Sequence, residues 1–154
     1  MPCYLVPQDV VVRHAREKDL PGLFELDRIV TYEYFKPLYI SSYAHLPVGH
    51  NPNYYLDMEI EEDKEWFPAC IAKEVKDVLL VAHDTINDKI VGLIGEHQDS
   101  WDELKIDLLL ILKAYRGRGI DKRLVCNFLQ SFPDAKSCVV YPFQYSNEAT
   151  LSFY

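Results

Sequence analysis

The segment that most constrains this fold runs from Leu108 to Val125 and joins an apolar run, a turn and an amphipathic pattern. The aliphatic run 108–112 is typical of a strand that is covered on both faces. Gly117 and Gly119, two of the chain's six glycines, follow in an Arg/Gly turn, where missing side chains let backbone N–H groups approach a ligand closely. A helix that begins there directs the positive end of its dipole at that ligand. The segment therefore predicts a strand, a phosphate-binding turn and a helix.

The composition fits one domain, which we expect to span residues 1–154. A chain of 154 residues with 49% hydrophobic content is long enough to bury a core of its own. With 24 acidic and 16 basic residues, its formal net charge of −8 repels nucleic acid and anionic membrane surfaces. A cationic small substrate suits such a protein better. We therefore expect neither a nucleic-acid partner nor a membrane partner.

The cysteines and the N-terminal residues point to the cellular compartment. The four cysteines are widely separated and form no C-x-x-C pair, which favours reduced thiols and indicates no metal site. Residues 1–13 lack the basic and apolar regions of a signal peptide. No apolar run approaches the roughly 18 residues that span a membrane. These features predict a cytoplasmic protein.

The first third of the chain predicts a strand followed by a helix. Residues 10–12 are three valines, a β-branched run that favours a strand. Asp19 followed by Pro21 is typical of a helix start. Apolar residues then recur at helical spacing and form one stripe, with Glu25 and Asp27 off it. The stripe consists of Leu20, Leu23, Phe24, Leu26 and Val30.

The next part of the chain is rich in tyrosine and then in acidic residues. We interpret Tyr32–Tyr55 as a helix followed by a long loop, whose aromatic side chains suit either a core edge or a pocket wall. The charge run 57–63 predicts the start of another helix, which continues to Val75. Acidic residues at a helix start interact favourably with the helix dipole.

From Val78 onward the pattern changes to strands. Three antiparallel strands are predicted over 78–82, 90–96 and 104–112, with a turn over 84–89. A helix over 119–132 and a strand over 137–141 follow, and the strand-helix-strand rule makes the last strand parallel to the third. A final helix is predicted from Asn147 onward. The expected fold class is α/β, or more strictly α+β, with a mixed, mainly antiparallel central sheet and helices on both faces.

This order of elements, with Arg116-Gly-Arg-Gly119 at the exit of a strand, resembles the GCN5-related N-acetyltransferase (GNAT) family. The family's turn has the pattern Gln/Arg-x-x-Gly-x-Gly/Ala and is often preceded by Tyr. Tyr115, Arg116 and Gly119 match this pattern. The family also often carries an Asn after its fifth strand and a Tyr seven residues later, as Asn147 and Tyr154 do here.

The resemblance implies that acetyl-CoA is the acyl donor, without a metal. The pantetheine arm would pair with backbone groups of Leu109, Leu110 and Ile111, and Asn147 would hold the cofactor arm or the helix entry. Tyr154 matches the family's general acid, which protonates the departing thiolate. The pyrophosphate would bind the turn and the helix start, which comprise Arg116, Gly117, Arg118, Gly119, Ile120 and Asp121.

The reaction also needs a group that removes a proton from the acceptor. An ammonium with a pKa near 10.4 has no lone pair with which to attack a thioester. Glu96, Glu103 and Asp107 are carboxylates on strands that face the expected cleft, and His97 is a possible relay. Because Asp107 shares a side-chain face with Leu109 and Ile111, we name it as the candidate base.

Two departures from the family pattern bear on function. Asp121 occupies the last small position of the turn, where it adds negative charge near a pyrophosphate or simply interacts with the helix dipole. Family members usually continue past the position of Tyr154 with a final pair of strands. The expected domain is therefore C-terminally shortened, and an open sheet edge would make a homodimer plausible.

These observations leave three functional hypotheses. The first is an N-acetyltransferase that transfers an acetyl group to the primary amine of a small molecule or peptide by direct attack in a ternary complex. The alternative is a catalytically weak acyl-CoA-binding regulatory relative, which Asp121 and the short C-terminus favour. A dinucleotide-binding domain ranks last, since Lys122 stands where a third glycine belongs. The identity of the acceptor amine is not readable from this sequence.

Overall fold

The fold is built around a five-stranded sheet among the described residues, with the spatial order β1-β2-β3-β4-β5. The structure, a computed structural model, describes residues 9–37, 52–74, 76–96 and 103–140. The strands are β1 (Val10–His14), β2 (Leu79–Asp84), β3 (Lys89–Glu96), β4 (Glu103–Ile111) and β5 (Ser137–Val140). The β2–β3 and β3–β4 pairings are antiparallel and the β4–β5 pairing is parallel, as the sequence predicts, and β1 pairs antiparallel with β2.

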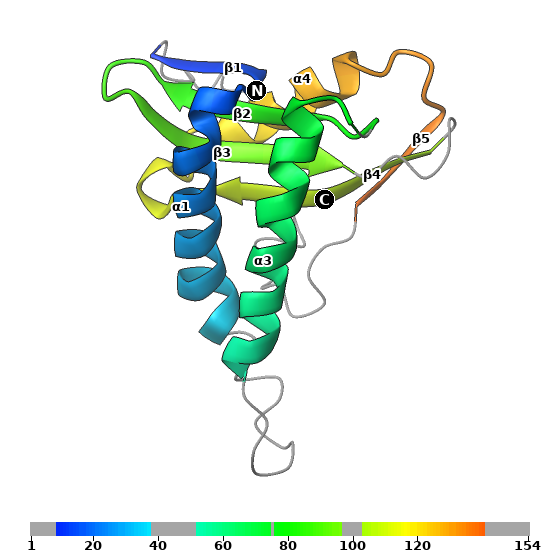
Figure 1. The fold of residues 1–154 in the computed structure, drawn as a ribbon. Coiled ribbons are helices and arrows are strands. Elements are labelled where there is room, and N and C mark those ends of the chain that lie inside the picture. Colours follow the sequence, from blue (N-terminus) through cyan, green and yellow to red (C-terminus); the bar gives the residue numbers. More distant parts are fainter. Residues whose placement is uncertain (1–8, 38–51, 75, 97–102, 141–154) are drawn as a thin grey trace.

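Helices cover both faces of this sheet (Figure 1). One face carries α1 (Leu20–Val30) and α3 (Pro52–Ile71), and the other carries α4 (Ile120–Gln130). Two glycines of β3 show the two faces directly. A Cβ added at Gly95 would meet Trp66 of α3, whereas a Cβ added at Gly92 would meet Leu124 of α4. The expected fold class, a mixed α/β sheet with helices on both faces, is confirmed.

The start of α1 is fixed by Asp19, as predicted. A short 3₁₀ turn (Glu17–Asp19) leads into the helix, and Pro21 lies in its first turn. The buried Asp19 carboxylate accepts two hydrogen bonds from the Arg13 guanidinium, at 2.7 and 2.9 Å, and one from the Arg16 backbone N–H at 2.8 Å. This arrangement fastens the end of β1 to the start of α1.

The apolar stripe of α1 packs on the sheet, and Asp27, which is predicted to lie off that stripe, is nevertheless buried. Leu23, Leu26 and Val30 are buried, and Asp27 is only 2% exposed. The reason is that α3 packs beside α1 and covers a second side of it. Thr31, in a π-helical turn (Thr31–Phe35) that follows α1, donates a hydrogen bond to Asp27 at 3.3 Å.

The limits of α3 also differ from the prediction. The helix begins at Pro52, a residue favoured in a first turn, and ends at Ile71 rather than at Val75. The acidic run 57–63 therefore lies in the middle of α3 and not at its dipole-favoured start. Burial raises the pKa of Asp63 to about 8, and the neighbouring Asp27 carboxyl adds to this effect.

The remaining elements follow the sequence prediction closely. The hairpin strands, β5 and α4 all occur within a few residues of their expected limits. The described cysteines, Cys70, Cys126 and Cys138, are free thiols. No helix in the described ranges combines the length and apolarity needed to cross a membrane. Most of the predicted loop within 32–55 and the predicted helix from Asn147 lie outside the described residues.

A β-bulge interrupts the pairing of β3 with β4 and bears on the site. Gly95 pairs with Leu108 and Glu96 pairs with Ile106, so Asp107 is an extra residue on β4. The parallel pairing of β4 with β5 covers Glu103–Ile106. The bulge and the last β4–β5 pair therefore coincide, and beyond this point β4 continues along β3 alone among the described strands.

Candidate functional site

The turn after β4 has the backbone geometry that its glycines predict. Gly117 and Gly119 have φ angles of 77° and 78°, in the left-handed region that glycine adopts without steric strain. Gly119 is the residue before the first residue of α4, and its carbonyl accepts the backbone N–H of Arg123 at 3.1 Å. The chain thus reverses in a short turn and enters α4 directly.

This turn is open to a ligand. Arg116, Gly117 and Arg118 are exposed, and a Cβ added at Gly117 would meet no atom within 4 Å. The N-terminus of α4 lies directly behind them, so its unpaired N–H groups and dipole favour an anion here. An exposed Arg/Gly turn before a helix N-terminus can therefore bind a phosphate or pyrophosphate.

Side chains hold the turn against the sheet. The Arg116 Nε donates to the carbonyl of Ile111, the last residue of β4, at 2.9 Å. The Tyr115 hydroxyl donates to Asp84 at 2.7 Å, and the Arg118 guanidinium lies 5.2 Å from the centre of the Tyr115 ring. Arg116, predicted as a cofactor-binding residue, thus also positions the turn.

Asp84 helps to hold this turn, a role that the sequence analysis missed. It is buried at the end of β2, and its carboxylate also accepts the backbone N–H groups of Ile86 and Asn87 at 3.0 and 3.1 Å and the Asn87 side chain at 2.8 Å. The Asn87 amide, followed by the Tyr115 hydroxyl, holds the pKa of Asp84 well below its usual range. An Asp at the start of a turn-rich segment predicts the local bonds, but not the bond to Tyr115.

The predicted cofactor-binding residues of β4 and α4 would act through their backbone. The side chains of Leu110, Ile111 and Ile120 are buried in the core. On the side away from β3, residues 108–111 lie beyond the described pairing with β5. Asp121 is partly exposed in the first turn of α4, where its charge interacts favourably with the helix dipole.

The structure brings two of the three predicted carboxylates together. Asp107 is exposed at the bulge, and Glu96 pairs in register one residue away. Glu103 lies at the opposite end of the β4–β5 pairing, opposite Ser137. Burial, followed by the negative charges of Asp77 and Asp107, raises the pKa of Glu96 to about 7. The other predicted site residues, His97, Asn147 and Tyr154, lie outside the described residues.

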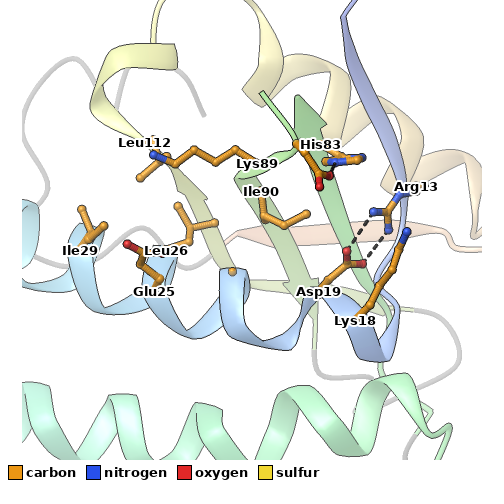
Figure 2. Close-up of a pocket in the computed structure, with 12 residues that line it drawn as sticks. Arg13, Lys18, Asp19, Glu25, Leu26, Ile29, His83, Lys89, Ile90 and Leu112 are labelled. Carbon is orange, nitrogen blue, oxygen red and sulfur yellow. Dashed lines mark hydrogen bonds and ion pairs between the residues drawn. The ribbon is translucent and has the colours of Figure 1, made fainter. Parts of the chain in front are cut away.

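A separate cavity of about 390 Å³ lies between α1 and the β2–β3 turn (Figure 2). It contains charges of both signs, including the Arg13–Asp19 pair and a His83–Asp88 contact of 2.8 Å. Its apolar lining includes Ile90. None of the predicted site residues lines this cavity, which no sequence pattern indicated. In the described part of the chain, no group of three or more His, Cys, Asp or Glu side chains could hold a metal ion.

Comparisons with known proteins agree with this geometry. The family model described as the acetyltransferase (GNAT) family matches residues 34–154. No curated protein sequence matches the chain. Among solved structures, the PaiA N-acetyltransferase from Thermoplasma acidophilum in complex with coenzyme A is 16% identical, with a TM-score of 0.68. That match covers 94% of this chain and 85% of the other.

Two further structures are aminoglycoside-related enzymes with the same fold. An aminoglycoside acetyltransferase from an uncultured soil metagenomic sample, solved with sisomicin, is 15% identical with a TM-score of 0.57, and the match covers 96% and 86% of the two chains. The structure of AAC(6')-Iy with a bisubstrate analogue of CoA and acetylneamine is 15% identical with a TM-score of 0.57, over 94% and 84%. At such identities the likeness shows a shared fold.

Proposed function

Because this chain belongs to the acetyltransferase (GNAT) family, we propose that it transfers an acetyl group from acetyl-CoA to a primary amine. The observation that carries the proposal is the exposed turn with two left-handed glycines at the exit of β4. It adjoins the stretch of β4 that lies beyond the β4–β5 pairing. Together they provide a pyrophosphate site and an adjacent strand edge.

Acetyl-CoA would bind this surface mainly through backbone groups. Its pyrophosphate would accept N–H groups between Gly117 and Asp121, assisted by the α4 dipole and the charge of Arg118. The amide-rich pantetheine arm would pair, as an added strand does, with the side of residues 108–111 that lies beyond the described pairing of β4 with β5. Asn147 remains a predicted contact to the cofactor arm.

The chemistry follows from the thioester. A neutral amine attacks the carbonyl carbon, the tetrahedral intermediate collapses, and the C–S bond breaks to release coenzyme A as a thiolate. Tyr154 is the proposed acid that protonates this thiolate. Asp107 lies exposed at the bulge, beside the stretch of β4 proposed for the pantetheine arm, as a proposed contributor to proton removal from the acceptor.

The acceptor is proposed to be the amine of a small molecule or a peptide. Two structural relatives are aminoglycoside acetyltransferases or were solved with an acetylneamine analogue. The net charge of −8 also favours a cationic guest. We therefore propose a substrate with at least one ammonium group.

A catalytically weak acyl-CoA-binding relative is the second candidate, and Asp121 is the observation that favours it. Its carboxylate adds a negative charge to the helix turn that would meet the pyrophosphate. Arg123, one of the nearby cations, donates to the Val10 carbonyl and is tied to β1. A weaker affinity for acetyl-CoA, caused by the charge of Asp121, would leave the fold intact but reduce turnover.

A turnover assay separates the two candidates. The protein would be mixed with acetyl-CoA and, in turn, sisomicin, spermidine and a short peptide with a free N-terminus, and release of the coenzyme A thiol would be followed. Amine-dependent thiol release supports the acetyltransferase. Saturable acetyl-CoA binding without thiol release for any amine supports the binding relative. Absence of both contradicts the proposed function.

A further inference from the structure

The last residue of β3, Glu96, is a buried carboxyl group without a hydrogen-bond partner. Its side chain is 0% exposed, and neither carboxylate oxygen has a partner among the described residues. Buried polar groups in folded proteins are almost always hydrogen-bonded, and an isolated buried charge is strongly unfavourable. An unpartnered buried carboxyl group therefore indicates that a donor binds there in a functional state of the protein.

Close packing surrounds the end of β3, where Glu96 lies. At Gly95 the missing side chain makes room for Trp66 of α3, whose ring lies only 2.5 Å from where a Cβ would stand. The same indole donates its N–H to Asp77 at 2.8 Å. Trp66 thus packs against the end of β3 on the face of Gly95 and holds the Asp77 carboxylate, whose negative charge acts on Glu96.

Glu96 also lies at the point where the proposed acyl site begins. It pairs with Ile106, which pairs with Val140 as the last β4–β5 pair. Asp107, the bulged residue, follows immediately. Cys138 of β5 pairs with Leu104, two residues before Ile106 on β4, so Glu96 lies in the register where β3, β4 and β5 run side by side.

We propose that Glu96 accepts the proton that the acceptor ammonium must lose, and that Asp107 beside it attracts the ammonium to the bulge. This assignment rests on the proposed function and moves the base from the exposed Asp107 to the buried Glu96 on the neighbouring strand. The ammonium is the donor that the two unpartnered oxygens lack. Its positive charge would also offset the cluster of Asp77, Asp107 and Glu96.

The proposed step balances in protons and charge. The ionised Glu96 takes one proton from the ammonium and becomes neutral. The resulting amine uses its lone pair to form the new C–N bond, and the C–S bond breaks with its electron pair on sulfur. The second nitrogen proton is lost as the amide forms, and the thiolate gains one proton, so Glu96 retains the single proton that is later released to solvent.

The charge environment suits this role. Burial, then Asp77 and Asp107, raise the pKa of Glu96 to about 7, while the nearby Lys105 backbone N–H, whose geometry does not form a hydrogen bond with either oxygen, lowers it slightly. A base is most effective when its pKa is near the working pH. The thiol of Cys138 also interacts with Glu96, and burial, then the charge of Glu96, raise the pKa of this thiol.

The test compares Glu96→Gln with Glu61→Gln, a control that makes the same change at an exposed residue of α3. Acetyl-CoA affinity is measured by calorimetry, and the single-turnover rate is measured with the fastest amine among sisomicin, spermidine and the peptide. We expect Glu96→Gln to bind acetyl-CoA within about twofold of wild type and to lower the rate by roughly 10²- to 10⁴-fold. The rate of wild type should rise through about pH 7, and this limb should vanish in the variant.

A second variant keeps the test decisive if Glu96→Gln is unstable. Glu96→Asp retains a carboxyl group and should retain the pH-dependent limb at a reduced rate. Unchanged rate and pH profile in Glu96→Gln, with wild type active, overturn the assignment of Glu96 alone. A wild-type protein that binds acetyl-CoA but acetylates none of the amines overturns the proposed function and this assignment with it.

Discussion

Two buried carboxylates at opposite ends of the sheet behave in opposite ways. Asp84 ends β2 and Glu96 ends β3, and since these neighbouring strands are antiparallel, the two residues lie at opposite ends of the strands. Asp84 accepts four hydrogen bonds, and its pKa is held well below the usual range. Glu96 has no partner among the described residues, and its pKa is raised to about 7.

The difference fits a structural role for Asp84 and the proposed role of Glu96 as a proton acceptor. Donors arranged around Asp84 keep it ionised, so it can hold the turn after β4 through Tyr115 at any ordinary pH. Burial without donors leaves Glu96 poised to exchange a proton near neutral pH.

The largest expected effect is a change in the pH dependence of stability in Glu96→Gln. A carboxyl group with a raised folded-state pKa binds its proton more tightly when folded, so stability falls as pH rises from its unfolded value toward about 7. The shift corresponds to about 3 kcal/mol of unfolding free energy. Urea unfolding at pH 5 and pH 8 should show wild type losing about that much more than Glu96→Gln. An equal loss in both proteins would contradict the unpartnered state of Glu96.

Gly95→Ala should break the packing around Glu96. The new methyl group would lie against the Trp66 ring, at a separation that real contacts do not show. Overpacking of this kind reduces stability by about 2 kcal/mol. Thermal unfolding measures the loss, and Lys64→Ala, at an exposed position of α3, the helix that carries Trp66, is the control. A Gly95→Ala protein as stable as wild type would contradict the described packing.

Tyr115→Phe tests the hydrogen bonding of Asp84 at the other end of the sheet. The variant removes the 2.7 Å hydrogen bond to Asp84 but leaves the three other donors in place. The expected loss of stability is about 1 kcal/mol, with a weaker acetyl-CoA affinity because the turn is held less firmly. Urea unfolding and calorimetry provide the two values. Unchanged affinity would show that the turn does not depend on Asp84.

The smallest expected effect is that of Asp121→Ala. Removing this carboxylate from the first turn of α4 loses a favourable dipole interaction of about 0.5 kcal/mol. It also removes negative charge beside the proposed pyrophosphate, so acetyl-CoA affinity should rise severalfold at low salt and less at high salt. An affinity that falls would mean that Asp121 supports the cofactor site.

Local patterns were sufficient to predict most elements but not the contacts between distant ones. Asp19 with Pro21, the valines of β1 and the glycines of the turn act through their neighbours in sequence, and the structure has the helix start, strand and turn that they predict. The burial of Asp27 depends on α3 packing beside α1, which no periodicity in α1 reveals.

The candidate site shows the same division. The turn and the strand before it were readable because glycine and aliphatic residues impose their own conformations. The contrast between Asp84 and Glu96 was not readable, since it arises from Tyr115, thirty-one positions from Asp84, and from the bulge at Asp107. The cavity beside α1 likewise combines residues from three separate segments.

A calorimetric titration with acetyl-CoA tests most directly whether the turn after β4 binds the cofactor. Wild type is compared with Arg116→Ala, which loses the hydrogen bond to Ile111, and with Lys64→Ala, which removes one positive charge from the surface of α3. NAD serves as the control ligand. The assignment of the cofactor site to the turn after β4 predicts saturable one-site binding of acetyl-CoA by wild type and Lys64→Ala, much weaker binding by Arg116→Ala, and no binding of NAD. Equal binding by all three proteins, or none by wild type, would contradict it.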